Sequence, residues 1–184
     1  MKFEPKLDPR LIPATMDDYP IIQNMWLYYI YDMGRECGFM KGWECPATPG
    51  FVPDDLTPYF EEPEREAFLI KVEDELAGFV LLRQTGSSLN IHWDMSEFFI
   101  LAKFQGKGVG SQIAQAIWNT HPGHWEVSVF LENKSALGFW RKVISAYTGK
   151  AYNEEIKTID YNKNQHQRYF LSFNTSEHTP IGGL

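Results

Sequence analysis

Apolar side chains recur every three or four positions between residues 17 and 33, which is the spacing of an amphipathic helix. The positions that carry this pattern are Ile21, Ile22, Met25, Trp26, Tyr29, Ile30 and Met33. Residues 10–15 before them have the character of a short strand, and Thr15 or Asp17 could cap the start of the helix. We therefore expect a short strand followed by a long helix.

Glycine and proline interrupt this pattern between residues 34 and 53 and predict a long loop. Residues 54–60 could add one short helix with Asp54 as its cap. Two runs of apolar residues, 67–72 and 76–82, then flank the acidic tripeptide Glu-Asp-Glu. Two such runs around a short polar turn are typical of a β-hairpin.

The remaining elements alternate between strand-like and helix-like spacing. We expect strands at residues 89–101, 125–131, 156–161 and 169–173, and helices at residues 108–119 and 135–145. The resulting order is β-α-α-β-β-β-α-β-α-β-β. Hairpins combined with a crossover predict a mixed α/β (α+β) sheet with helices on both faces. Because the chain has 184 residues, we expect a single domain spanning residues 1–184.

The composition narrows the class of protein without selecting a function. The formal net charge of −7 argues against nucleic acid as a partner, because phosphate binding needs clustered Lys and Arg. The sequence contains no stretch of about 18 apolar residues that could cross a membrane, and no secretory signal is expected. These features favour a cytoplasmic protein. Cys37 and Cys45 have no metal-ligand spacing around them, and two free thiols are favoured over a disulfide.

The most informative run, residues 105–110, has the sequence Gln-Gly-Lys-Gly-Val-Gly between a predicted strand and a predicted helix. Glycine permits positive φ and close approach of a ligand, and a helix start adds unpaired N–H groups. This combination favours a pyrophosphate site, although a plain strand-to-helix turn could use the same residues. Two other phosphate motifs are excluded by spacing, because Lys107 precedes Gly108 rather than Ser or Thr, and the glycines alternate instead of forming Gly-x-Gly-x-x-Gly.

Residues 105–110 fit the Gln/Arg-x-x-Gly-x-Gly/Ala signature of the GNAT superfamily of acetyl-CoA-dependent N-acetyltransferases. Residues 133–140, Asn-Lys-Ser-Ala-Leu-Gly-Phe-Trp, resemble the downstream Asn-x-x-Ala-x-x-Phe-Tyr pattern of that family. The order of elements is also similar from residue 10 onward. The resemblance implies an N-acetyltransferase that uses acetyl-CoA and no metal. It also implies a largely antiparallel sheet of six to seven strands, with a splayed gap between strands four and five.

The resemblance further implies which residues hold acetyl-CoA. In this family the glycine-rich turn binds the pyrophosphate through backbone amides, and a bulged strand before it binds the pantetheine arm. Asn133 would contact the pantetheine region, although Asn in front of a helix is also a good cap. Trp140 would pack against the cofactor or the core. The implied CoA-binding residues are Phe98, Phe99, Ile100, Gln105, Gly106, Lys107, Gly108, Val109, Gly110, Ser111, Asn133 and Trp140.

The general base in this family is frequently a carboxylate on the fourth strand, where Asp94 and Glu97 are the candidates. Regular alternation would place Asp94 on the face of Phe98, and Glu97 on the opposite face unless a bulge reverses the parity. His92 has the parity of Asp94 and is a third candidate. Each of the three could instead be an exposed or salt-bridged strand residue. We favour Glu97 because a bulge is expected nearby.

Two departures from the family pattern affect catalysis. The general-acid Tyr of the family, seven residues after the Asn, is replaced by Trp140, and an indole cannot serve as that acid. Tyr147, another tyrosine or water would then supply the proton, or the acid is absent. Val143 and Ile144 also stand where the family has Gly-Phe. A catalytically weak acyl-CoA-binding sensor or scaffold is therefore the alternative interpretation.

The resemblance also implies where the acceptor binds. In this family the acceptor site is walled by the segments corresponding to residues 26–60 and 147–161. The first of these segments contains several aromatic and acidic side chains, which together suit a cation. Core packing and solvated charge would explain the same residues. We expect a small-molecule or peptide amine as the partner, and a homodimer is possible.

Overall fold

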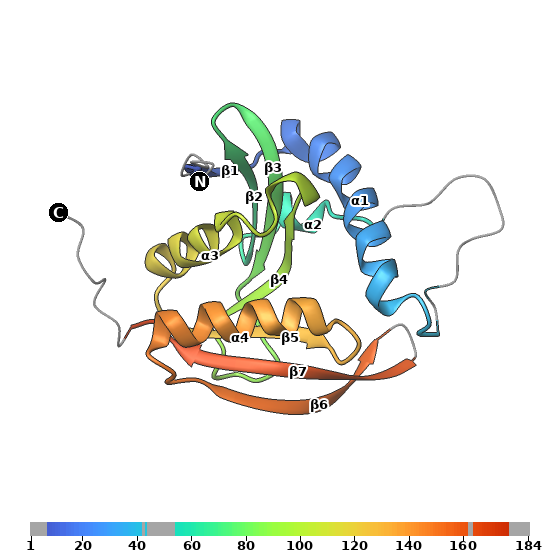
Figure 1. The fold of residues 1–184 in the computed structure, drawn as a ribbon, viewed down its shortest axis with the longest axis vertical. Helices are drawn as coiled ribbons and strands as arrows, with labels where there is room; N and C mark the ends of the chain where they lie inside the picture. Colours follow the sequence, from blue (N-terminus) through green and yellow to red (C-terminus); the bar gives the residue numbers. More distant parts are fainter. Residues whose placement is uncertain (1–6, 42, 44–53, 162–163, 177–184) are drawn as a thin grey trace, which may run out of the picture.

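The computed structural model describes residues 7–41, 43, 54–161 and 164–176. These residues form a seven-stranded sheet in the order β1-β2-β3-β4-β5-β7-β6, with helices on both faces (Figure 1). The strands are β1 (Pro9–Pro13), β2 (Arg65–Val72), β3 (Glu75–Arg83), β4 (Trp93–Ile100), β5 (His124–Phe130), β6 (Asn153–Tyr161) and β7 (Asn164–Asn174). The helices are α1 (Tyr19–Cys37), α2 (Pro58–Glu61), α3 (Val109–Thr120) and α4 (Lys134–Thr148), with short 3-10 turns at Met16–Asp18 and Ala102–Phe104. The predicted fold class is confirmed.

The sheet is antiparallel except where β4 meets β5. These two strands run parallel and pair only at Trp93 with Trp125 and at Asp94 with Glu126. On its other side, β4 stays paired with β3 as far as Ile100. Strand β4 therefore leaves β5 after two residue pairs, which confirms the splayed gap between strands four and five. In Figure 1 the half of the sheet formed by β1–β4 lies above the half formed by β5–β7.

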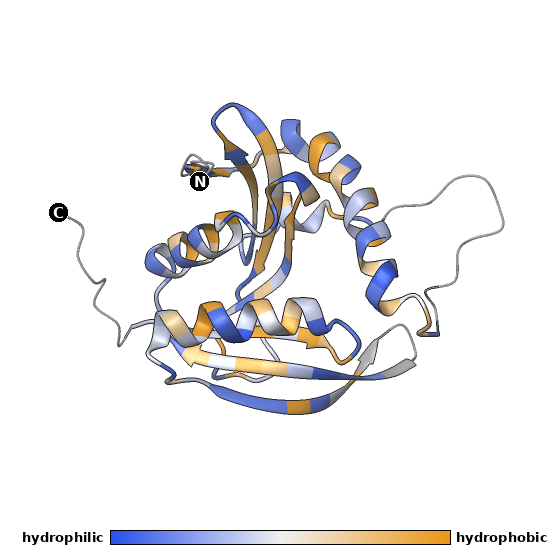
Figure 2. Ribbon diagram, in the orientation of Figure 1, coloured by the Kyte–Doolittle hydropathy of each residue, from blue (hydrophilic) through white to orange (hydrophobic). Residues whose placement is uncertain are grey.

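Strand β3 is apolar on both faces because helices cover the sheet from both sides. Val80 packs in a core with Ile113 of α3. Its neighbour Phe79 packs in a second core with Ile22 and Trp26 of α1. Figure 2 shows that hydrophobic residues are concentrated in the central strands, whereas β6 at the edge of the sheet is largely hydrophilic. The two cores hold the central strands between α1 on one face and α3 and α4 on the other.

Several element boundaries differ from the sequence prediction. Helix α1 continues to Cys37 instead of ending at residue 33. The helix expected at residues 54–60 is confined to α2, where Thr57 rather than Asp54 precedes the first turn. Asp54 instead accepts a hydrogen bond from Nε1 of Trp26 at 3.1 Å. Strand β4 begins at residue 93, later than expected.

Part of the expected loop, residues 42 and 44–53, lies outside the described residues, and Cys45 falls there. Cys37, at the end of α1, is a buried free thiol. No helix within the described ranges is long and apolar enough to cross a membrane. Over the same ranges, no group of three or more His, Cys, Asp or Glu side chains is arranged to hold a metal ion.

Gly78 is the position in β3 where the sheet tolerates no side chain. A Cβ atom there would lie 1.9 Å from the carbonyl oxygen of Phe99 in β4. We expect Gly78→Ala to lower the free energy of unfolding by about 1–3 kcal/mol, because the strands must move apart. Urea unfolding measures this loss.

Gly138→Ala is the matched control, because Gly138 is exposed on α4 and a Cβ atom added there would meet no heavy atom within 4 Å. The control should gain up to about 1 kcal/mol from helix propensity. A Gly78→Ala variant as stable as the wild type would contradict the close approach of β3 and β4.

Candidate active site

A cleft of about 430 Å³ opens where β4 separates from β5. Its lining comes from α1, β4, the glycine-rich turn, β5, α4 and β7. The predicted CoA-binding residues in this lining are Phe98, Phe99, Ile100, Gln105, Gly106, Gly110, Asn133 and Trp140. The predicted site residues outside it are Asp94, Lys107, Gly108, Val109 and Ser111. Glu97 lines the cleft, so the structure brings one of the two carboxylate candidates together with most of the predicted binding residues.

A β-bulge in β4 decides which way its acidic side chains point. Leu81 of β3 pairs with Glu97. The next residue of β3, Leu82, pairs with Met95, which leaves Ser96 as an extra residue in β4. An extra residue shifts the alternation of the strand by one position. The two segments of β4 on either side of Ser96 therefore have opposite parity.

The bulge places Asp94 and Glu97 on the same face of the sheet, the face that α1 covers. Leu81, the partner of Glu97, packs in the core beneath α1. Phe98 points to the opposite face, where its ring centroid lies 5.0 Å from that of Trp140 in α4. Regular alternation, which would have placed Asp94 on the face of Phe98, is therefore interrupted, and the bulge expected near Glu97 is the reason.

Glu97 is held by a tyrosine of α1. The hydroxyl of Tyr29 donates a hydrogen bond to Oε2 of Glu97 at 2.6 Å. The Tyr29 ring lies against Phe79 and Phe99, with centroids 5.9 and 5.6 Å away. Trp26 of the same helix packs on this ring at 5.2 Å. The tyrosine hydroxyl is therefore fixed in an aromatic layer with the Glu97 carboxylate as its partner.

Burial raises the pKa of Glu97 from its ordinary value to about 7. Removal of water disfavours the charged form of a carboxyl group. The hydrogen bond from Tyr29 and the charge of Arg168 oppose this shift, whereas the negative charges of Asp94 and Asp54 add to it. Near neutral pH, Glu97 can therefore both accept and release a proton.

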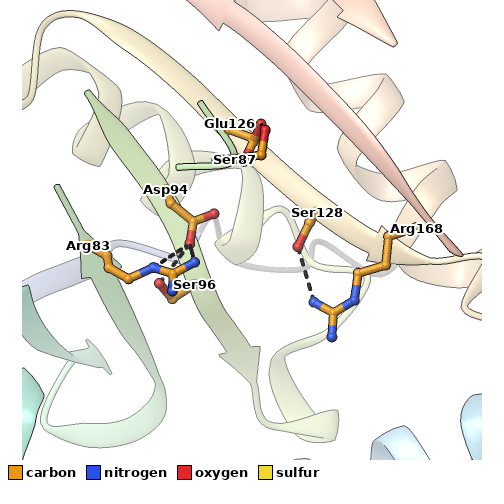
Figure 3. A network of polar contacts seen from close by, with 7 residues as sticks. All are labelled: Arg83, Ser87, Asp94, Ser96, Glu126, Ser128 and Arg168. Carbon is orange, nitrogen blue, oxygen red and sulfur yellow. Dashed lines mark hydrogen bonds and ion pairs between the residues drawn. The ribbon is translucent and has the colours of Figure 1, made fainter. Parts of the chain in front are cut away.

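Asp94 is buried, and its carboxylate is already engaged. Its Oδ2 accepts hydrogen bonds from Nε and Nη2 of Arg83 at 3.0 and 2.7 Å, and from Oγ of Ser96 at 2.9 Å (Figure 3). Burial raises the pKa of Asp94, although Arg83 acts against this shift. Through Ser96, Asp94 anchors the bulge. His92 is exposed, and its Nδ1 accepts a hydrogen bond from the backbone N–H of His124 at 3.2 Å, away from the cleft lining.

Two left-handed glycines shape the turn between β4 and α3. Gly106 and Gly108 have φ angles of 71° and 81°, where a side chain would be strained. A Cβ atom on Gly110 would lie 3.1 Å from the ring of Phe139. The side chain of Gln105 donates to the carbonyl of the last residue of β4 at 2.8 Å and so ties the turn to the strand. The first turn of α3 leaves its N–H groups without helical acceptors, which suits an anion.

Three other predicted CoA-binding residues of the glycine-rich turn and the start of α3 differ in how far they are buried. Lys107 is exposed and Ser111 is half-buried. Val109 is completely buried and packs in the core with the other apolar residues of α3. That these three residues bind CoA through their backbone amides remains a prediction.

Helix α4 supplies the opposite wall of the cleft. Asn133 caps this helix, because its Oδ1 accepts a hydrogen bond from the N–H of Ala136 at 3.0 Å. Its Nδ2 donates to the sulfur of Met33 in α1 at 3.3 Å. Trp140 is only 6% exposed and packs among core aromatic residues. The cap and a ligand role are compatible, since Asn133 also lines the cleft.

Three functional candidates in the lining were not singled out by sequence reasoning: Tyr29 as the partner of Glu97, Ser128 and Arg168. The Arg168 guanidinium lies 3.9 Å from the ring centroid of Phe130, and its Nη1 donates to Oγ of Ser128 at 3.3 Å (Figure 3). The sequence does contain a signal for Tyr29, because a tyrosine on the buried stripe of a helix brings a hydroxyl that needs a hydrogen-bond partner inside the protein. No local signal exists for Arg168, because pairing of β7 with β5 brings it to the cleft.

The model of the acetyltransferase (GNAT) family matches residues 28–144. The match covers more than half of the chain, and this protein therefore belongs to the GNAT family of acetyltransferases. No curated protein matches the sequence.

Solved structures share this fold at low sequence identity. An acetyltransferase from Thermus thermophilus is 19% identical, and the match covers 92% of this chain and 98% of the Thermus chain with a TM-score of 0.60. A ribosomal L7/L12 alpha-N-protein acetyltransferase in complex with coenzyme A is 14% identical over 92% of this chain and 96% of its own, with a TM-score of 0.62. A nourseothricin acetyltransferase is 16% identical over 91% and 98%, with a TM-score of 0.55.

The raised pKa of Glu97 predicts that Glu97→Gln stabilises the fold at neutral pH. The unfolded carboxyl ionises at its ordinary pKa, but the folded carboxyl keeps its proton until about pH 7, so the wild type loses stability as pH rises through this window. The shift corresponds to about 3 kcal/mol at most. Thermal unfolding should give a Tm advantage of Glu97→Gln that grows between about pH 5 and 7.5 and then stays constant.

Glu64→Gln removes the same charge at an exposed position and serves as the control. Its Tm difference from the wild type should not grow across that pH window. A pH-independent difference for Glu97→Gln as well would show that the carboxyl titrates at its ordinary value in the folded protein.

Proposed function

We propose that this protein transfers an acetyl group from acetyl-CoA to the amine of an acceptor. The observation that carries the proposal is Glu97, a half-buried carboxyl with a pKa of about 7 in the cleft between β4 and β5. An amine loses a proton as it attacks a thioester, and a base with this pKa is matched to that step near neutral pH. Membership of the GNAT family supports the same class of reaction.

The residues around the gap suit acetyl-CoA, which would supply the thioester that the amine attacks. The left-handed turn at Gly106 and Gly108 and the start of α3 would bind the pyrophosphate. Beyond the two β4–β5 pairs, backbone groups of β4 face the gap instead of a neighbouring strand, so they could bond the pantetheine amides. One of these N–H groups could also polarise the thioester carbonyl. Phe98 and Trp140 would form an apolar wall beside it.

We assign the general base to Glu97 and a supporting role to Asp94. The Asp94 carboxylate is occupied by Arg83 and Ser96 and lies outside the cleft lining. Its proposed contribution is to fix the bulge that turns Glu97 toward the cleft. The acceptor would approach along α1, where Asp32, Arg35 and Glu36 line the cleft and Arg35 forms an ion pair with Asp32. Glu36 would favour a positively charged amine.

A second candidate function is an acyl-CoA-binding sensor with little catalysis. Trp140 favours it, because this indole stands where the family pattern has an acidic phenol and packs into the core. Both functions require CoA binding, and they differ only in whether an amine is acetylated.

Binding of CoA is tested by thermal shift with acetyl-CoA and CoA. A ligand present at about 100 times its Kd should stabilise the protein by about 2.7 kcal/mol. Gly108→Glu should abolish this shift, because its carboxylate would repel the pyrophosphate at the start of α3. Gly149→Glu is the matched control, since Gly149 also has a left-handed φ, of 62°, but caps the far end of α4. An unchanged shift for Gly108→Glu would mean that the pyrophosphate binds elsewhere.

Acetyl transfer is tested by thiol release from acetyl-CoA across a panel of small and peptide amines. For an accepted amine, kcat/KM should fall as pH decreases through about 7, because protonated Glu97 cannot accept a proton. Glu97→Gln should lose about 100-fold or more in kcat at pH 8. A protein that binds CoA but releases no thiol with any amine would support the sensor and overturn the transferase.

A further inference from the structure

The leaving sulfur of a thioester needs a proton, and the α4 residues that line the cleft include no phenol that could give one. Trp140 stands at the position expected for an acid. Tyr147 lies outside the cleft lining, and its hydroxyl donates to Oδ1 of Asn119 at 3.0 Å. Among the described residues that line the cleft, Tyr29 of α1 is the tyrosine.

We propose that Tyr29 is a catalytic residue that passes the proton collected by Glu97 on to the departing thiolate. The proposal rests on the N-acetyltransferase function proposed above. Glu97 takes the proton that the amine loses as the new N–C bond forms. Tyr29 gives its phenolic proton to the sulfur as the C–S bond breaks, and the Glu97 carboxyl returns its proton to Tyr29. The balance is one proton lost by the amine and one gained by the thiol, with both side chains restored.

The geometry allows a proton to pass between Glu97 and Tyr29 without movement of heavy atoms. The Tyr29 oxygen and Oε2 of Glu97 are 2.6 Å apart, a short hydrogen bond along which a proton can move directly. Contacts with Trp26, Phe79 and Phe99 hold the ring in place. Both Tyr29 and Glu97 line the same cleft, so an amine within reach of Glu97 brings the thioester close to the phenol.

The electrostatics favour a relay over a free phenolate. Burial, and then the neighbouring Glu97, raise the pKa of Tyr29 well above its ordinary value. A phenol of this kind gives up its proton readily only when it receives another. Glu97, with a pKa of about 7, can supply that proton, and the overall transfer to a thiolate is downhill if its pKa resembles that of a cysteine thiol, about 8.5.

The other charged groups that face Glu97 come from its own strand and from two further segments. Asp94 of β4 and Asp54 before α2 raise the pKa of Glu97, and Arg168 of β7 lowers it. The hydrogen bond from Tyr29 lowers it as well. Removing the phenolic hydroxyl should therefore shift the titration of Glu97 to higher pH, while the contributions of the other three groups remain.

The test is the pH profile of kcat for Tyr29→Phe, with Tyr28→Phe as the matched control. Tyr28 loses the same hydroxyl one residue away, at a site that is 54% exposed and outside the cleft lining. If Tyr29 passes the proton, kcat of Tyr29→Phe stays about 100-fold below the wild type even on the plateau above pH 8. If Tyr29 only lowers the pKa of Glu97, the profile moves to higher pH but the plateau recovers to the wild-type value, which would overturn the relay. Tyr28→Phe should match the wild type throughout.

A readout that needs no turnover tests the Tyr29–Glu97 pair itself. The pH window in which Glu97→Gln gains Tm over its parent should move upward when both proteins carry Tyr29→Phe. An unmoved window would mean that the hydrogen bond is absent in solution and would overturn the relay while leaving the transferase intact. A wild type that binds CoA but acetylates no amine would overturn the proposed function and the relay together.

Discussion

Strand β4 is hydrogen-bonded to β3 along almost its whole length, but to β5 at only two residue pairs. The backbone groups that would have continued the β4–β5 ladder face a cleft instead. The glycine-rich turn follows the end of β4 that β5 does not pair with, after one short 3-10 turn, and α3 starts beside the same opening. The early separation of these two strands therefore opens the cleft beside which the other features that suit a CoA-type ligand lie.

Burial of charge has different consequences at the two carboxylates of β4. The negative charge of Asp94 is balanced by the Arg83 guanidinium, and its carboxylate also accepts a hydrogen bond from Ser96. Asp94 can therefore be buried in its charged form. Glu97 has a neutral hydroxyl as its hydrogen-bond partner, and burial therefore raises its pKa to about 7. A protein optimised for stability alone would pair or remove such a carboxyl, whereas a base that works near neutral pH requires this environment.

The aromatic residues on the two faces of the sheet contribute differently to the cleft. On the α4 face, Phe98 and Trp140 form an apolar wall against the central strand. On the α1 face, the rings of Phe79 and Phe99 enclose Tyr29 and direct its hydroxyl to Glu97. The cleft thus has an indole where the family pattern has a phenol, and a phenol on the opposite side.

The sequence by itself determined the order of elements, the glycine-rich turn and the family, because periodicity, positive φ and motif spacing are local properties of the chain. It also placed a base candidate at Glu97, but it could not decide between the faces of Glu97 and Asp94. Only the tertiary structure decided that, because the bulge at Ser96 is defined by the register between β3 and β4. The same holds for Tyr29 and Arg168, which packing of α1 and pairing of β7 bring to the cleft from distant parts of the chain.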